Sequence, residues 1–104
     1  FIPFPEPALE RNIIRARVPD ISERLGHQLV AFVQSVRQLD VRKVPSISET
    51  IDWARVLLVL HAEELNHDLV RDTLNIFLKF EEDIAVVRER LPQLTSGAVR
   101  AAGG

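Results

Sequence analysis

The apolar residues of this 104-residue chain recur mostly three and four positions apart, which is the spacing of one face of an α-helix. The clearest case spans residues 20–39 and has its apolar positions on one side: Leu25, Leu29, Phe32, Val36 and Leu39. Asp20, followed three residues later by Glu23, predicts where this helix begins. We expect the opposite face to lie in water because its residues are polar. They are Arg24, Gln28, Gln34, Arg37 and Gln38.

A second apolar stretch, residues 41–60, contains the only tryptophan, Trp53. Pro45 disfavours helical geometry in the residue before it, and Ser46 with Glu49 three residues later has the spacing of a capping box. Ser48 is almost as suitable a cap, so the start of this helix stays open by about two residues. Apolar residues then surround most of the helix axis. The pattern therefore predicts a helix that is buried on most sides.

Weaker patterns complete a helical interpretation of the chain. Residues 1–7 contain three prolines, which favours an extended arm, and a short amphipathic helix follows them. Asn66 is a candidate cap for another helix, and a fifth, after a bend near Phe80, ends at Pro92. The small residues of 92–104 predict a flexible tail. The sequence thus predicts an all-α bundle of four to five helices over residues 8–91, between an extended arm and a flexible tail.

Composition narrows the possible functions. The chain is 46% hydrophobic and 27% charged, a balance typical of one folded domain. Its net charge of −2 provides no broad basic surface, so we expect no nucleic-acid partner and disfavour a DNA-binding helix-turn-helix. The apolar run Val56–Leu60 is far shorter than the roughly 20 residues that cross a bilayer, so we expect no membrane partner. The absence of cysteine agrees with a reducing, cytoplasmic compartment.

The chain has no recognisable catalytic motif. It lacks a glycine-rich phosphate loop, a nucleophile elbow and a Ser/His/Asp set. The segment His61–His67 has two histidines six positions apart, which is not the spacing of a zinc helix, and we expect solvated loop residues there. The acidic residues 81–83 point in different directions around a helix, where they suit its positive end better than a shared substrate. No catalytic or metal site is predicted.

Three cations are candidates for binding an anion. Arg42 and Lys43 directly precede a predicted helix start, where free amides and cationic side chains point the same way and favour a phosphate. Two exposed cations in a loop more commonly serve solubility. Arg55 lies within the apolar helix and must either pair or extend to the surface. Asp52, three residues earlier, is its ordinary partner, and a phosphate on a neighbouring domain is the functional alternative.

Five segments together resemble a known family. They read FIPFPEPALERNII, VPDISERL, QLVAFVQSVRQLD, RKVPSISETIDWARVLLVL and LNIFLKFEEDI, and they extend from Phe1 to about Leu91. They resemble the C-terminal helical lid of MoxR-like AAA+ ATPases. The resemblance implies that the arm leads from a nucleotide-binding core domain and that the helices close over ATP and Mg²⁺ bound there. The phosphate loop, the Mg²⁺-binding carboxylates and the arginine finger belong to that core, so the parent would be an ATPase and this fragment alone would not.

The same resemblance implies a nucleotide-proximal site. In such lids a sensor-2 arginine near the start of the third lid helix reaches the γ-phosphate of ATP. No arginine lies in the corresponding first turn here, residues 46–50. We therefore expect the phosphate contact from Arg55 or, failing that, from Arg42. The nucleotide-proximal set implied in this way comprises Arg55, Arg42, Lys43, Ser48 and Glu49.

The resemblance also implies partners. Proteins of this family commonly form hexameric rings and act as chaperones that remodel or mature other proteins, often von Willebrand factor A proteins or metalloenzymes. A different reading remains open, in which the chain is a free-standing helical interaction module without a nucleotide. In that case the apolar arm, residues 1–4, and the helix that carries Trp53 would bind a protein partner.

Overall fold

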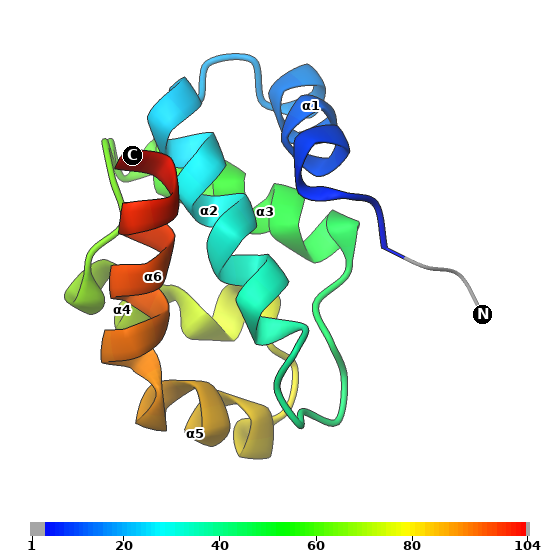
Figure 1. The fold of residues 1–104 in the computed structure, drawn as a ribbon, viewed down its shortest axis with the longest axis vertical. Helices are drawn as coiled ribbons and strands as arrows, with labels where there is room; N and C mark the ends of the chain where they lie inside the picture. Colours follow the sequence, from blue (N-terminus) through cyan, green and yellow to red (C-terminus); the bar gives the residue numbers. More distant parts are fainter. Residues whose placement is uncertain (1–3, 104) are drawn as a thin grey trace.

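The computed structural model describes residues 4–103, and every regular element in that range is an α-helix (Figure 1). The helices are α1 (Pro7–Arg17), α2 (Glu23–Val36), α3 (Ile47–Val59), α4 (His67–Phe77), α5 (Glu81–Glu89) and α6 (Leu91–Gly103). The all-α prediction is confirmed. The number of helices in the described range is six, above the expected four to five. None of them has both the length and the apolar composition needed to cross a membrane.

Side-chain caps fix two of the helix starts. Ser22 accepts a hydrogen bond from the Leu25 N–H at 3.0 Å and begins α2, and Asn66 begins α4 as the sequence predicts. The expected Asp20 cap is wrong by two residues. The reason is a turn in which the Ile21 N–H donates to the Val18 carbonyl at 3.1 Å, which delays the helix.

The capping box at the start of α3 is confirmed. The Ser46 hydroxyl accepts from the Glu49 N–H at 3.2 Å, and the Glu49 carboxylate accepts from the Ser46 N–H at 2.9 Å. The choice between Ser46 and Ser48 is thereby decided. Ser48 lies one residue inside the helix and its side chain is exposed.

We expect Ser46→Ala to lower the free energy of unfolding by about 1 kcal/mol, because the first turn of α3 loses the oxygen that pairs with its amide. Ser48→Ala is the matched control and should change stability by less than about 0.5 kcal/mol. Urea denaturation followed by circular dichroism measures both. Equal effects of the two substitutions would contradict the assignment of the cap.

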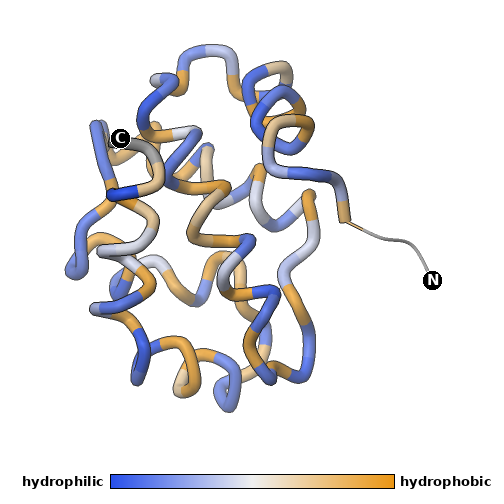
Figure 2. The backbone as a smooth tube through the Cα atoms, in the orientation of Figure 1, coloured by the Kyte–Doolittle hydropathy of each residue, from blue (hydrophilic) through white to orange (hydrophobic). Residues whose placement is uncertain are grey.

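The core forms around three aromatic side chains from different helices. The Trp53 ring stacks on Phe77 with 4.3 Å between centroids, and Phe32 lies 5.5 Å from Trp53 and 6.0 Å from Phe77. The Trp53 indole N–H donates to the Thr73 hydroxyl at 2.8 Å, so its one polar group is paired in the interior. Hydrophobic and hydrophilic positions alternate along the helices in Figure 2, so that several helices each contribute an apolar face to this core.

Helix α6 corrects the prediction of a flexible tail over residues 92–104. As far as residue 103 this segment is helical and packs beside α2, the most extensive contact between any two helices in the described range (Figure 1). Leu91, Thr95 and Ala98 are buried at helical spacing. Pro92 lies in the first turn, where a helix needs no N–H from it, so it is compatible with a helix start as well as with a helix end. Small residues allow α6 to approach α2 closely.

Two polar residues on α2 are buried, although the whole polar face was expected in water. Gln28 is 0% exposed, and its Oε1 atom accepts from the Leu65 N–H at 2.6 Å. The Arg37 side chain is 4% exposed. Helix α3 departs from expectation in the opposite direction, because it is buried around Trp53 but leaves Val59 and Leu60 exposed at its end. These differences follow from which neighbours the fold supplies.

Candidate functional site

The start of α3 brings together three of the five residues predicted to lie near a nucleotide. The Lys43 Nζ atom lies 3.0 Å from Glu49 Oε1, and Arg42 precedes Lys43 on the same loop. Lys79, which the sequence did not indicate, lies 3.7 Å from the second oxygen of Glu49. Ser48 is exposed in the first turn of α3. Arg42, Lys43, Ser48 and Glu49 therefore belong to one region of the surface.

The loop before α3, residues 42–46, is held by the acidic start of α5. The Asp83 carboxylate is 1% exposed and accepts from the Arg42 N–H at 2.7 Å and from the Lys43 N–H at 3.1 Å. The Arg42 guanidinium pairs with Glu82 at 2.7 Å and lies over the Phe80 ring, 4.4 Å from its centroid. The residues at 82 and 83 thus anchor a loop some forty positions earlier in the sequence, in addition to favouring the positive end of their own helix.

Each cation of this region faces a carboxylate of the same chain. The hydrogen bond from Arg42 lowers the pKa of Glu82, and Lys43 and Lys79 share Glu49. Ion pairs between half-exposed side chains contribute little to stability. A ligand of higher negative charge, such as a polyphosphate, has the chemistry to displace such carboxylates. The arrangement can therefore bind an anion, but only in exchange for its own acidic side chains.

Arg55 lies apart from this region. It is exposed two turns further along α3, with its guanidinium 3.9 Å from Asp52, so the ordinary partner expected from the sequence is present. Its other neighbours are apolar: Val56, Val59 and Leu60 line a shallow hollow of about 210 Å³ with it. The structure thus does not bring Arg55 together with Arg42 and Lys43.

The charge state of Glu49 should make the start of α3 sensitive to acid. Burial raises the pKa of Glu49, but the Ser46 N–H and the Lys43 ammonium outweigh burial, and the pKa lies below its ordinary value of 4.5. A pKa that is lower in the folded chain means that the carboxylate stabilises the fold above about pH 4.5 and loses that contribution as the pH falls further. Glu49→Gln should therefore be less stable than the parent near neutral pH, with a difference that shrinks in acid.

Urea denaturation of both proteins at several values between about pH 7 and about pH 3 measures this difference. Glu63→Gln, which changes an exposed glutamate in the loop before α4, is the control and should give a difference independent of pH. A stability gap between Glu49→Gln and the parent that stays constant across the range would contradict the assigned role of the carboxylate.

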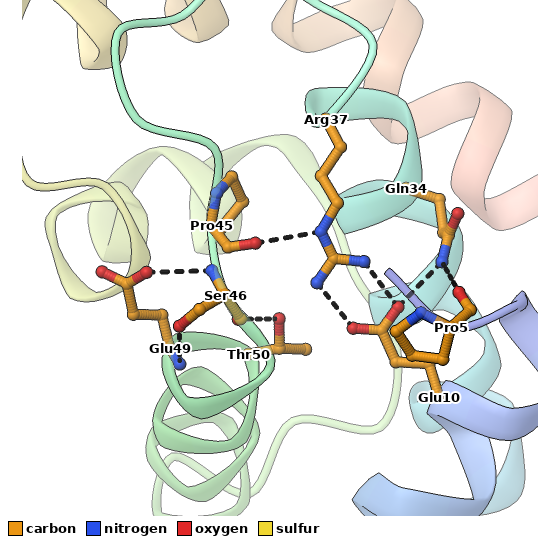
Figure 3. Close-up of polar contacts among 8 residues, drawn as sticks. All are labelled: Pro5, Glu10, Gln34, Arg37, Pro45, Ser46, Glu49 and Thr50. Carbon is orange, nitrogen blue, oxygen red and sulfur yellow. Dashed lines mark hydrogen bonds and ion pairs between the residues drawn. The ribbon is translucent and has the colours of Figure 1, made fainter. Parts of the chain in front are cut away.

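A second polar cluster, which the sequence did not predict, lies behind this region (Figure 3). It is centred on a bidentate ion pair in which the Arg37 guanidinium donates to both carboxylate oxygens of Glu10 at 2.7 Å. Glu10 is 0% exposed. Gln34 Nε2 also donates to Glu10, at 2.8 Å, so the buried carboxylate has three hydrogen-bond donors. Burial of both charges is compatible with stability only because the pairing is this complete.

The remaining contacts of this cluster connect separate segments. Arg37 Nε donates to the carbonyl of Pro45 at 2.9 Å, directly before the cap of α3. The Phe4 ring covers the guanidinium with 4.1 Å between its centroid and Cζ, and Gln34 donates to the Pro5 carbonyl at 3.3 Å. We call the group the Arg37 cluster: Phe4, Pro5, Glu10, Gln34, Arg37 and Pro45. No periodicity in the sequence links Glu10 to Arg37, because their contact depends on how α1 packs on α2.

The largest hollow in the described part of the chain lies elsewhere, between the start of α4 and α6. Its volume is about 630 Å³, and Leu65, Thr95 and Val99 are among its lining residues. It shares no residue with the region around Lys43. Over residues 4–103 no three histidine, aspartate or glutamate side chains gather as metal ligands.

Comparison with known proteins assigns no family. No protein-family model, curated protein or solved structure matches this chain at a significant level. A functional interpretation therefore depends on the residues and on their geometry.

Proposed function

We propose that this chain is the helical lid of a MoxR-like AAA+ ATPase and that it closes over ATP bound to a core domain. The resemblance of the segment RKVPSISETIDWARVL to the sensor-2 region of such lids supports the proposal. The observation that carries it is the position of the two leading cations of this segment. Arg42 and Lys43 lie side by side in an anchored loop directly before the exposed first turn of α3.

In this proposal the lid supplies charge and the core supplies the chemistry. ATP and Mg²⁺ bind to the core, whose residues carry out hydrolysis. The lid contributes cations next to a helix start, where amide dipoles and cationic side chains both favour phosphate oxygens. Because Lys79 and the Ser46 N–H stay on Glu49, Lys43 is able to leave that carboxylate for a phosphate without leaving it unpaired. Arg55 remains the alternative contact.

The proposal extends to assembly. The parent protein would form a homo-oligomeric ring, hexameric in the pattern of the family, and would couple ATP hydrolysis to remodelling of a partner protein, such as a von Willebrand factor A protein or a metalloenzyme. Its place of action would be the cytoplasm. The resemblance described above supports these points.

The first experiment is to read the gene upstream of the codon for Phe1. A phosphate-loop motif within roughly 250 residues, the upper range of one domain, is the expected result. An initiator methionine close to Phe1 without such a motif would refute the proposal.

The second experiment measures ATP turnover of the complete gene product. Alanine substitutions at Arg42, Lys43 and Arg55 are made one at a time, and Arg88→Ala, on the exposed side of α5, is the control. Loss of one phosphate contact is expected to reduce turnover by about tenfold or more, in line with the loss of a charged group that stabilises the transition state. The control should have no effect. Unchanged turnover in all three variants would remove the lid cations from the mechanism.

A free-standing interaction module is the second candidate function. It is favoured by the end of α3, where Val59 and Leu60 are 75% and 53% exposed beside the hollow at Arg55. Apolar side chains in this setting are typical of a protein contact. The upstream sequence distinguishes the two candidates, since only the lid requires a nucleotide-binding domain before it.

A further inference from the structure

The Arg37 cluster connects the N-terminal arm to the start of α3. One guanidinium contacts the ring of Phe4 with its face, the carboxylate of Glu10 with two of its nitrogens and the carbonyl of Pro45 with the third. Figure 3 shows these donors pointing in different directions from Arg37 to Glu10 and to Pro45. Because a guanidinium is planar and rigid, a change at one of its contacts alters the geometry available to the others.

The arm is the contact that is able to move. Phe4 is 42% exposed, whereas Glu10 is 0% exposed and belongs to α1. Pro5 and Pro7 have no N–H, which limits the backbone hydrogen bonds that could hold the arm. Two contacts to α2 side chains hold it instead: the Phe4 ring on Arg37, and the Pro5 carbonyl bonded to Gln34. Loss of these contacts would admit water to a guanidinium that is now 4% exposed.

The other end of the connection is the first turn of α3. Pro45 directly precedes Ser46, which caps the helix with extended backbone geometry, φ −83° and ψ 172°. The hydrogen bond from Arg37 to the Pro45 carbonyl fixes the peptide plane between these two residues. The position of this plane determines whether the Ser46 oxygen reaches the Glu49 N–H. The cap of α3 thus depends on where Arg37 lies.

We propose that Arg37 couples the position of the N-terminal arm to the order of the first turn of α3. When the arm lies on α2, Arg37 is dry, holds the Pro45 carbonyl and keeps the cap of α3 closed. When the arm withdraws, water competes for the guanidinium and the first turn of α3 opens more often. The coupling is a property of the 104-residue chain and does not require a nucleotide, so it stands or falls separately from the proposed function.

Amide hydrogen exchange of the ¹⁵N-labelled chain tests this coupling. The reporters are the amides of Glu49 and Thr50, which bond to Ser46. The internal reference is the equivalent pair at the start of α4, the amides of Leu69 and Val70, which bond to Asn66. In Phe4→Ala the reporters should exchange about two to five times faster, the range expected for loss of a cation–π contact, while the reference pair does not change.

Leu9→Ala is the control, because it truncates an exposed apolar side chain of α1 outside the Arg37 cluster. It should leave the reporters unchanged. Arg37→Lys keeps the charge but lacks the planar fork, and in that background Phe4→Ala should have no further effect on the reporters. If Arg37→Lys does not fold, the comparison of Phe4→Ala with Leu9→Ala decides the question. Reporters that do not respond to Phe4→Ala, or that respond equally to Leu9→Ala or equally in the lysine background, would overturn the proposal.

Discussion

Glu10→Ala is expected to lower the free energy of unfolding by about 3–5 kcal/mol, because it leaves the Arg37 charge buried without its partner. The carboxylate is 0% exposed and accepts three hydrogen bonds, so water does not replace it easily. A loss of this size is a large share of the about 5–15 kcal/mol that usually stabilise a domain. Urea denaturation followed by circular dichroism measures it.

Asp52→Ala is the matched control, since it breaks the exposed ion pair with Arg55 and should change stability by less than about 0.5 kcal/mol. The double substitution Glu10→Leu with Arg37→Met should recover a large part of the loss, because it removes both buried charges at once. A cost of less than about 1 kcal/mol for Glu10→Ala would contradict the view that this pair is dry in solution.

Trp53→Ala is expected to lower the free energy of unfolding by a similar amount, about 3–5 kcal/mol. The indole is 0% exposed, stacks on Phe77 and contacts Phe32, so its removal leaves a cavity at the place where three helices meet. Circular dichroism is the appropriate measurement, because the variant has no tryptophan fluorescence. Val59→Ala, on the same helix but 75% exposed, should have an effect below about 0.5 kcal/mol.

Thr73→Val separates the polar part of this effect from the apolar part. The valine has nearly the same shape as threonine but leaves the indole N–H without an acceptor, and we expect a loss of about 1–3 kcal/mol. Tryptophan fluorescence follows the unfolding of this variant directly. If Thr73→Val proves as stable as the parent, the hydrogen bond does not hold the ring in place.

The two polar regions described above have different physical characters. The ion pairs around Lys43 are partly exposed and exchangeable, which suits them to contact with an anion. The Arg37 cluster is buried, and its cost of dissociation is high, which suits it to holding segments together. The carbonyl of Pro45 joins the two, because it accepts from Arg37 and lies at the end of the loop that carries Arg42 and Lys43.

Local signals in the sequence predicted much of the helical structure. The caps at Ser46 and Asn66 and the helical spacing of the core positions on α2 depend on residues within one or two turns of one another, so they can be read without knowledge of the fold. The misplaced cap of α2 and the missed helix α6 have a common cause. A turn at Val18–Ile21 and the packing surface of α2 override what Asp20 and the small C-terminal residues prefer by themselves.

The sequence by itself determined that the chain is helical, where α3 and α4 begin, and which aromatic residues form the core, because periodicity and capping act over a few residues. Only the tertiary structure decided the fate of the charges. Glu10 and Arg37 are 27 positions apart, and Asp83 lies some forty positions from the loop that it holds. Such pairs form where packing brings helices together and excludes water, and neither partner carries a local mark of the other.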